Sequence, residues 1–152
     1  MATEIQQAVS NDWQSIRSHL EAAGLPVEDL DASSMNRFFI ARSTERRFLG
    51  AVGMEQFGSD GLLRSLVVAD HARGLSLGRE LVARLEQYAV GAGITALWLL
   101  TIDADNFFRC LGFGSTDRDA VPDAVRAARE FSELCPASAF LMRKILPSKR
   151  GR

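Results

Sequence analysis

The segment His71–Val82 combines residue types that can bind an anion. It follows the apolar run Leu62–Ala69 and opens a stretch with helical periodicity. A strand that ends in a turn of small residues before a helix leaves backbone N–H groups unpaired beside the positive end of the helix dipole. Arg73 adds a fixed positive charge to this turn. The sequence therefore predicts an anion site at Arg73–Gly78.

The spacing of residues in this turn distinguishes between three known types of phosphate-binding loop. A Walker loop requires G-x-x-x-x-G-K-[ST], and this turn has no lysine; a Rossmann loop requires a G-x-G-x-x-G spacing that Gly74 and Gly78 do not have. The acyl-CoA pyrophosphate pattern [QR]-x-x-G-x-[GA] fits, except that Ser76 replaces its first glycine. If that position needs a positive φ, serine costs about 1–2 kcal/mol there. An ordinary strand-to-helix turn is the alternative interpretation.

Two further residues have chemical potential because of where they stand. Glu55 lies in an apolar strand, a setting that raises the pKa of a carboxyl, and is the candidate general base; an exposed edge glutamate is the alternative. Arg64 lies mid-strand among apolar residues, where an unpaired guanidinium is costly. It is expected to grip a substrate carboxylate, to pair with Glu55 across the hairpin, or both. Weaker candidates for the carboxylate are Arg37, Arg42 and Arg118.

Apolar periodicity predicts the elements that position these residues. Strands are expected over Ile5–Val9, Phe38–Arg42, Phe48–Phe57, Leu62–Ala69, Ile94–Thr101 and Ala139–Leu146, with a hairpin turn at 58–61. Four helices are expected. The first follows a cap at Asn11 and turns Trp13, Ile16 and Leu20 inward, and the second runs from Leu77 to Gly91 with Leu77, Leu81, Leu85 and Ala89 inward. The third ends at Gly112 with Asp103 or Asp105 as its cap, and the fourth starts at Pro122 with Val125, Ala128 and Phe131 inward. Residues 24–36 form a polar connection, either a solvated loop or a cover over an acceptor site. This order predicts an α/β (α+β) fold, a mixed sheet flanked by helices on both faces.

Composition limits the class of protein. A length of 152 residues fits one domain over 1–146, followed by a basic tail, 147–152, expected to be disordered. The net charge of −1 gives no basic field for nucleic acid, and no apolar run approaches the roughly 20 residues that span a bilayer. The N-terminus carries no signal pattern, so we expect a cytoplasmic location. Cys110 and Cys135 have no metal-ligand spacing.

Taken together, these segments resemble the GNAT superfamily of acyl-CoA N-acyltransferases over nearly the whole chain. The matching pieces are the strand 62–69, the loop 73–78, its helix, the strand 94–101 and N-F-F-R-C-L-G-F at 106–113. More narrowly, L-L-R-S-L-V-V (62–68), L-L-T (99–101), F-F (107–108) and L-C-P-A-S-A (134–139) resemble arsenic-resistance N-acetyltransferases, which are similar to amino-acid N-acetyltransferases. The two cysteines are then either ordinary thiols or a pair that binds trivalent arsenic.

The resemblance implies a GNAT-like fold with acetyl-CoA as the donor. Backbone groups of Leu66, Val67 and Val68, on a strand that splays from its neighbour, are implied to hold the pantetheine arm and polarise the thioester carbonyl. The remaining implied cofactor contacts are Arg73, Gly74, Leu75, Ser76, Leu77, Gly78, Arg79, Thr101, Phe107 and Phe108. Many relatives place a tyrosine acid where this chain has Phe108, so water or the hydroxyl of Ser65 or Thr101 is left to assist the thiolate. Asp70 also replaces a common proline.

The implied activity is acetylation of the amino group of a small molecule, an amino acid or an analogue of one. Glu55 would be the base and Arg64 the substrate-binding residue. A non-catalytic acyl-CoA sensor is the alternative, favoured by Phe108 and Ser76; a protein N-terminal or lysine acetyltransferase is a third reading. GNAT proteins often form dimers through their late strands, so a homodimer is one expected oligomeric state.

Overall fold

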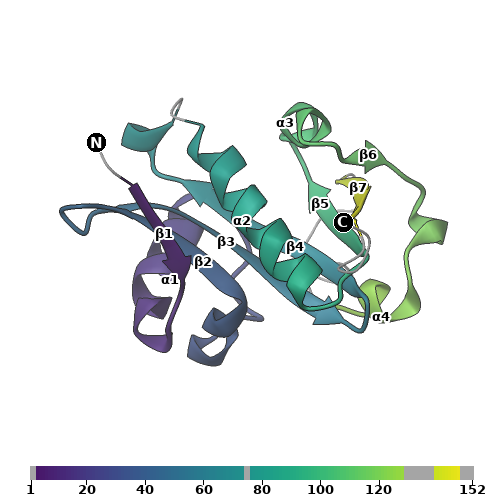
Figure 1. The fold of residues 1–152 in the computed structure, drawn as a ribbon, viewed down its shortest axis with the longest axis horizontal. Coiled ribbons are helices and arrows are strands. Elements are labelled where there is room, and N and C mark those ends of the chain that lie inside the picture. The colour runs from purple at the N-terminus through teal and green to yellow at the C-terminus, as the bar shows by residue number, and fades with distance from the viewer. Residues whose placement is uncertain (1–2, 74–75, 129–138, 148–152) are drawn as a thin grey trace. The chain divides into compact units, whose positions relative to one another are not determined.

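A computed structural model describes residues 3–73, 76–128 and 139–147, which group into two compact units (Figure 1). Unit 1 comprises 1–54 and 65–87, and unit 2 comprises 55–64 and 88–152. Strands β3 (Phe48–Phe57) and β4 (Asp60–Val68) and helix α2 (Leu77–Gly91) have residues in both. The strands are hydrogen-bonded in the order β1-β2-β3-β4-β5-β7-β6, which confirms the predicted mixed sheet.

Unit 1 has a helix on each face of its strands (Figure 1). Strands β1 (Thr3–Gln7), β2 (Phe38–Ser43) and β3 pair antiparallel, with Ile40 opposite Ala51. Helix α1 (Trp13–Ala22) buries its apolar side in a cluster that includes Ile40, Ala51 and Val67. Neighbouring strand residues point to opposite faces, and a Cβ on Gly50 would lie 3.0 Å from Leu81 of α2. The two helices therefore cover opposite faces, as the sequence predicted.

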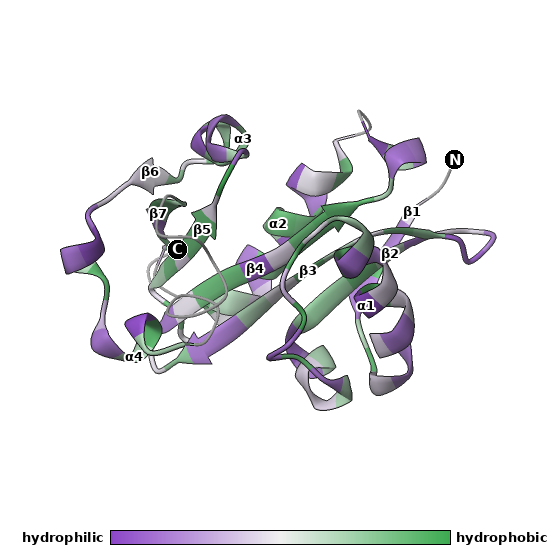
Figure 2. Cartoon of the chain, turned by 180° about the vertical axis from the view of Figure 1, so that it is seen from behind, coloured by the Kyte–Doolittle hydropathy of each residue, from purple (hydrophilic) through white to green (hydrophobic). Residues whose placement is uncertain are grey.

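Unit 2 is built around strand β5 (Ala96–Thr101), which is mostly hydrophobic in Figure 2. It pairs antiparallel with β7 (Phe140–Ile145) over its whole length, and β6 (Gly114–Ser115) pairs with β7. The start of β4 runs parallel to β5 from Asp60–Ala96 to Leu62–Trp98. Helices α3 (Asp105–Cys110) and α4 (Asp123–Arg126) follow β5, and Val125 of α4 packs in the cluster around Leu62 and Trp98. Strand β5 has a continuous apolar sequence because the neighbouring elements cover it.

Most predicted elements are confirmed, whereas two predicted helix caps are wrong. The inward residues of α1 and α2 are all buried. Asn11 lies inside a 3-10 turn, Ser10–Asp12, and α1 begins after Asp12. Neither Asp103 nor Asp105 caps α3: the cap position is Ala104, whose N–H donates to the Thr101 hydroxyl oxygen at 3.0 Å. In both cases the cap position lies one residue from a predicted one, and the side chain of the residue there makes no cap hydrogen bond.

The structure also moves some boundaries and adds elements. Strand β1 lies two residues earlier than predicted, and β6, which has two residues, was not predicted. The connection 24–36 is not wholly a loop, because residues from Ala32 form a 3-10 helix to Arg37. Phe131 and the tail beyond Pro147 lie outside the described residues. No helix in the described ranges has the length and apolar character to cross a membrane.

Asp31 gives this 3-10 helix a pH-dependent cap. The Ser33 hydroxyl, and then the Ser33 backbone N–H, hold the pKa of its carboxyl below the ordinary 3.8. A lowered folded-state pKa means that the stabilisation is complete above 3.8 and is lost as the pH falls through the folded value. The difference in Tm between the wild type and Asp31→Asn should be constant near neutral pH and shrink in acid. A difference that grew in acid would contradict this cap.

Candidate active site

Strand β4 changes conformation at Ser65, next to Arg64. Ser65 is buried and has φ +61°, a left-handed conformation that is uncommon for a residue other than glycine. Within unit 2 the parallel pairing of β4 with β5 covers three residue pairs and ends at Leu62 and Trp98, whereas β5 continues to Thr101. Positive φ in a strand is typical of a bulge that ends regular pairing and redirects the chain. The residues after the bend are Leu66, Val67 and Val68, the predicted cofactor strand.

The predicted anion loop leads into α2. Leu77 begins the helix with its side chain buried, Gly78 is half-buried and Arg79 is exposed; Gly74 and Leu75 lie outside the described residues. Arg73 Nε lies 3.5 Å from both the Val68 carbonyl oxygen and the Asp70 carboxylate. Both side chains are largely exposed, so this pair contributes little to stability. Arg73 therefore remains available to an anion at the start of the helix.

Ser76 has the backbone conformation that the acyl-CoA pattern assigns to glycine. Its φ is +60°, and its carbonyl oxygen accepts the first hydrogen bond of α2 from the Glu80 N–H at 3.1 Å. An L-residue pays about 1–2 kcal/mol for this conformation, which glycine adopts without steric cost. Because its φ is positive, Ser76 carries this steric strain.

Ser76→Gly should stabilise the protein. Relief of the left-handed strain, less the larger backbone entropy lost by glycine, leaves a gain of about 1 kcal/mol and raises Tm by about 2–4 °C. Ser76→Ala is the matched control, because it removes the hydroxyl and keeps the strain. Thermal melting of both variants tests this, and a Tm that rises in Ser76→Ala but not in Ser76→Gly would contradict it.

Glu55 and Arg64 form an ion pair across the β3–β4 hairpin of unit 2, one of the two arrangements predicted. Arg64 Nη1 lies 3.7 Å from Glu55 Oε2. The Arg64 side chain has 0% exposed surface, whereas that of Glu55 is 30% exposed. An adjacent cation favours an ionised carboxylate, the form that accepts a proton. The pair therefore presents a partly accessible carboxylate that a buried arginine holds.

Arg37, Arg42 and Arg118 have other surroundings. Arg42 pairs with Asp12 at 2.5 Å, and Arg118 donates to the Ala139 carbonyl oxygen at 2.9 Å. Arg37 ends the 3-10 helix before β2. Arg64 is the arginine whose burial and strand position best match the prediction.

The residues after β5 are mainly structural in their contacts. Phe108 is buried, and its ring lies edge-on to Phe113 with centroids 5.5 Å apart. Phe107 is 36% exposed and contacts Phe108 edge-on. Phe108 thus fills the core where relatives are expected to carry a tyrosine acid. The hydroxyl oxygen of Thr101, in unit 2, accepts a hydrogen bond from the Ala104 N–H at 3.0 Å, and its assistance to the thiolate stays a prediction. Cys110 is an exposed free thiol and Cys135 lies outside the described residues, so their pairing stays a prediction.

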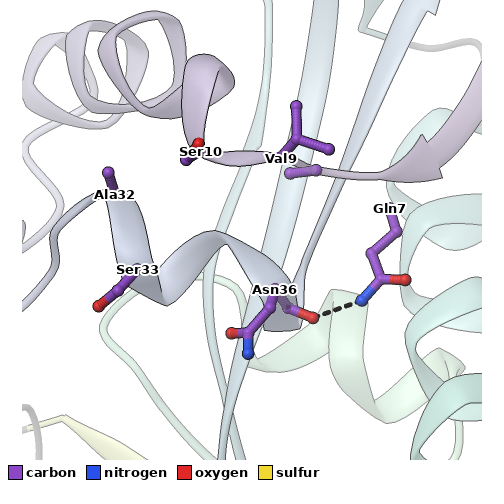
Figure 3. A pocket seen from close by; sticks show the side chains of 7 residues that line it. Gln7, Val9, Ser10, Ala32, Ser33 and Asn36 are labelled. Carbon is purple, nitrogen blue, oxygen red and sulfur yellow. Dashed lines mark hydrogen bonds between the residues drawn. The ribbon is translucent and has the colours of Figure 1, made fainter.

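Two cavities are lined by described residues of unit 1. One, of about 420 Å³, lies between the end of β1 and the 3-10 helix from Ala32, where Gln7 donates to the Asn36 carbonyl oxygen (Figure 3). It has no charged lining residue. The other, which we call the Arg47 cavity, has about 570 Å³ and is lined by His19, Ala22, Ala23, Arg47, Phe48, Val67, Val68, Ala69, Asp70, His71 and Arg73.

The predicted site residues thus lie in two groups. Leu66, Val67, Val68, Arg73 and Ser76–Arg79 belong to unit 1, and Glu55, Arg64, Thr101, Phe107 and Phe108 belong to unit 2. Sequence reasoning missed His19 and Arg47, which line the same cavity as Val67, Val68 and Arg73. The basic pair Arg46-Arg47 between two apolar strands was the available signal.

Comparison with known proteins identifies the family. The model of the acetyltransferase (GNAT) family matches residues 3–113. An uncharacterised N-acetyltransferase of Schizosaccharomyces pombe is 26% identical over 87% of this chain and 94% of its own.

Solved structures share the fold. The N-acetylglutamate synthase of Neisseria gonorrhoeae, solved with coenzyme A and N-acetyl-glutamate, has a TM-score of 0.83 at 21% identity over 96% of this chain. The chain spans about a third of that synthase's length, 35%. The Rv2747 protein of Mycobacterium tuberculosis, solved with CoA, has a TM-score of 0.80 at 19% identity, over 94% of this chain and 99% of its own. With this fold, and with the family match over most of its length, the chain belongs to the GNAT acetyltransferases and is an N-acetyltransferase that uses acetyl-CoA as its donor.

Proposed function

We propose that the acceptor is the amino group of an amino acid or of an analogue of one. The observation that carries this proposal is the buried Arg64 paired with the partly exposed Glu55 at 3.7 Å. A fixed guanidinium recognises a carboxylate, and a carboxylate beside it can take a proton from an ammonium group. An amino acid presents both of these groups on one small molecule. The synthase of similar fold, solved with N-acetyl-glutamate, supports this acceptor class.

The proposed chemistry assigns one task to each group. Acetyl-CoA supplies an electrophilic thioester carbonyl when it is bound. Glu55 removes a proton from the acceptor ammonium, directly or through water, so that the neutral amine can attack. Backbone N–H groups of Leu66–Val68 donate to the carbonyl oxygen, a contribution of about 3–4 kcal/mol to the barrier for a preorganised donor. The CoA thiolate leaves without a dedicated acid, because a free thiol has a pKa of about 8.5.

Arg64 has two roles that kinetics can separate. As a grip, Arg64 would bind the acceptor carboxylate. Because the Arg64 side chain has no exposed surface, that carboxylate must displace part of the contact between Arg64 and Glu55. As a positioning residue, it would hold Glu55 ready to accept a proton. The amino-acid acceptor rests on the grip, whereas the positioning role supports Glu55 as the base.

Arg64→Lys tests both roles. Lysine keeps the charge and loses the bidentate geometry. A grip predicts a KM for carboxylate acceptors raised by about tenfold, with little change for an amine that lacks the carboxylate. A positioning role predicts a lower kcat for both acceptors at similar KM. Arg42→Lys, at an arginine of unit 1 that pairs with Asp12, is the control. Unchanged kcat and KM with every acceptor would remove Arg64 from the site.

The resemblance to arsenic-resistance N-acetyltransferases proposes further acceptors to test. We propose that the tested panel include arsenic-containing and phosphinic analogues of glutamate beside the common amino acids. Preference for such an analogue over glutamate in kcat/KM would support the arsenic-resistance subgroup. Preference for a peptide N-terminus or a lysine side chain would instead favour a protein acetyltransferase.

A further inference from the structure

The Arg47 cavity carries a positive charge that neither the fold nor the acetyl-transfer chemistry explains. Its lining contributes the fixed charges of Arg47 and Arg73 and the imidazoles of His19 and His71. The acid in the lining is Asp70, whose side chain is 97% exposed and is turned to Arg73 at 3.5 Å. A volume of about 570 Å³ lies in the range of small-ligand sites.

The local structure fixes Arg47 at this cavity. The buried Ser43 hydroxyl oxygen accepts hydrogen bonds from the backbone N–H groups of Glu45 at 3.2 Å and Arg47 at 3.1 Å. The Ser43 N–H donates to the Arg47 carbonyl oxygen at 3.0 Å, which closes the turn between β2 and β3. Arg46 takes the strained position of this turn, with φ +68°. The turn therefore sets the backbone from which Arg47 reaches the cavity.

The His19 ring in the lining is also held in place. The His19 ring stacks on Phe48 with centroids 3.7 Å apart, and its Nδ1–H donates to the Ser15 carbonyl oxygen at 2.8 Å. The ring orientation is thus fixed, and Nε2 is left for another partner. A concave site lined by two arginines and two imidazoles favours an anion with several acceptor oxygens.

We propose that the Arg47 cavity binds a phosphate group. Two sources carry this chemistry: the 3′-phosphate of acetyl-CoA and free phosphate. The cavity shares Val68 and Arg73 with the predicted cofactor strand and loop, which favours the 3′-phosphate. The inference does not depend on the amino-acid acceptor.

Calorimetric titration of the full chain distinguishes the sources. The ligands are acetyl-CoA, 3′-dephospho-acetyl-CoA and inorganic phosphate, and the variants are Arg47→Ala and the charge reversal Arg47→Glu. Arg46→Ala is the matched control, a neighbouring arginine of the same turn that does not line the cavity. Melting curves of the three variants establish that the turn is intact.

Each outcome has one meaning. If the 3′-phosphate binds here, Arg47→Ala weakens acetyl-CoA by about tenfold and Arg47→Glu by more, while 3′-dephospho-acetyl-CoA is unaffected. If free phosphate binds, the loss is confined to inorganic phosphate. The proposal is overturned if the Arg47 variants bind all three ligands with the same affinities as Arg46→Ala. It is also overturned if the Arg47 variants lose equal affinity for the two thioesters while their binding of inorganic phosphate is unchanged. If acetyl-CoA binds equally well to the wild type and to Arg47→Ala, the phosphate proposal fails and the acetyltransferase activity is not contradicted.

Discussion

Glu55→Gln is expected to lower kcat by about 10²–10⁴-fold, the range for loss of a positioned general base. Glutamine has nearly the same shape as glutamate and cannot take the proton. The carboxylate of Glu55 is the group that Arg64 holds at 3.7 Å and that keeps 30% of its side-chain surface exposed. Steady-state kinetics at saturating acetyl-CoA, measured across pH, test this expectation. The kcat of Glu55→Gln should lie below that of the wild type at each pH at which both proteins stay folded.

Two controls separate catalysis from folding. Glu21 is also paired with an arginine, Arg17, on the surface of α1, so Glu21→Gln should leave kcat unchanged. Glu55→Asp keeps a carboxylate and should retain more activity than Glu55→Gln. A kcat for Glu55→Gln within about twofold of the wild type, with an unchanged pH profile, would show that Glu55 is not the base.

Gly53→Ala is expected to cause a large loss of stability. A Cβ at Gly53 would lie 2.3 Å from Phe38 Cζ and 2.5 Å from both Cε atoms. Phe38 is 1% exposed, so its ring has no free space to move into. Overpacking of this kind costs about 1–3 kcal/mol, and the upper end lowers Tm by about 6–12 °C in a chain of this size.

A double-mutant cycle tests the cause. Phe38→Leu removes the ring atoms that the new methyl meets, so Gly53→Ala should cost much less in that background. Gly91→Ala, where a Cβ meets nothing within 4 Å, is the control and should be neutral or slightly stabilising. Equal costs of Gly53→Ala in the two backgrounds would contradict the steric explanation.

The sequence predicts the framework well because periodicity reports burial. The four inward residues of α2, spaced by four, are all buried, and the apolar run of β5 is a strand. Caps and short pairings were harder because several local groups compete for one backbone partner. Thr101 rather than an aspartate receives the Ala104 N–H, and β6 has only two residues.

The candidate site was predictable in part. The spacing at 73–78 and the unusual placement of Arg64 were visible in the sequence. The structure shows the Glu55–Arg64 pair, which was one of the two predicted arrangements, and gives Ser76 a positive φ. His19 and Arg47 were not identified, because a cavity between a helix end and a distant turn depends on tertiary packing that no local pattern encodes.

The central claim, acetyl transfer from acetyl-CoA to the amine of an amino acid, is tested most directly by thiol release across a panel of amino acids and glutamate analogues. The assay subtracts the thiols of Cys110 and Cys135 and is run beside melting curves with acetyl-CoA. We expect protection by acetyl-CoA and turnover that depends on an acceptor with both an amine and a carboxylate. Protection without turnover would instead indicate an acyl-CoA sensor, and equal turnover with amines that lack the carboxylate would contradict the proposed acceptor.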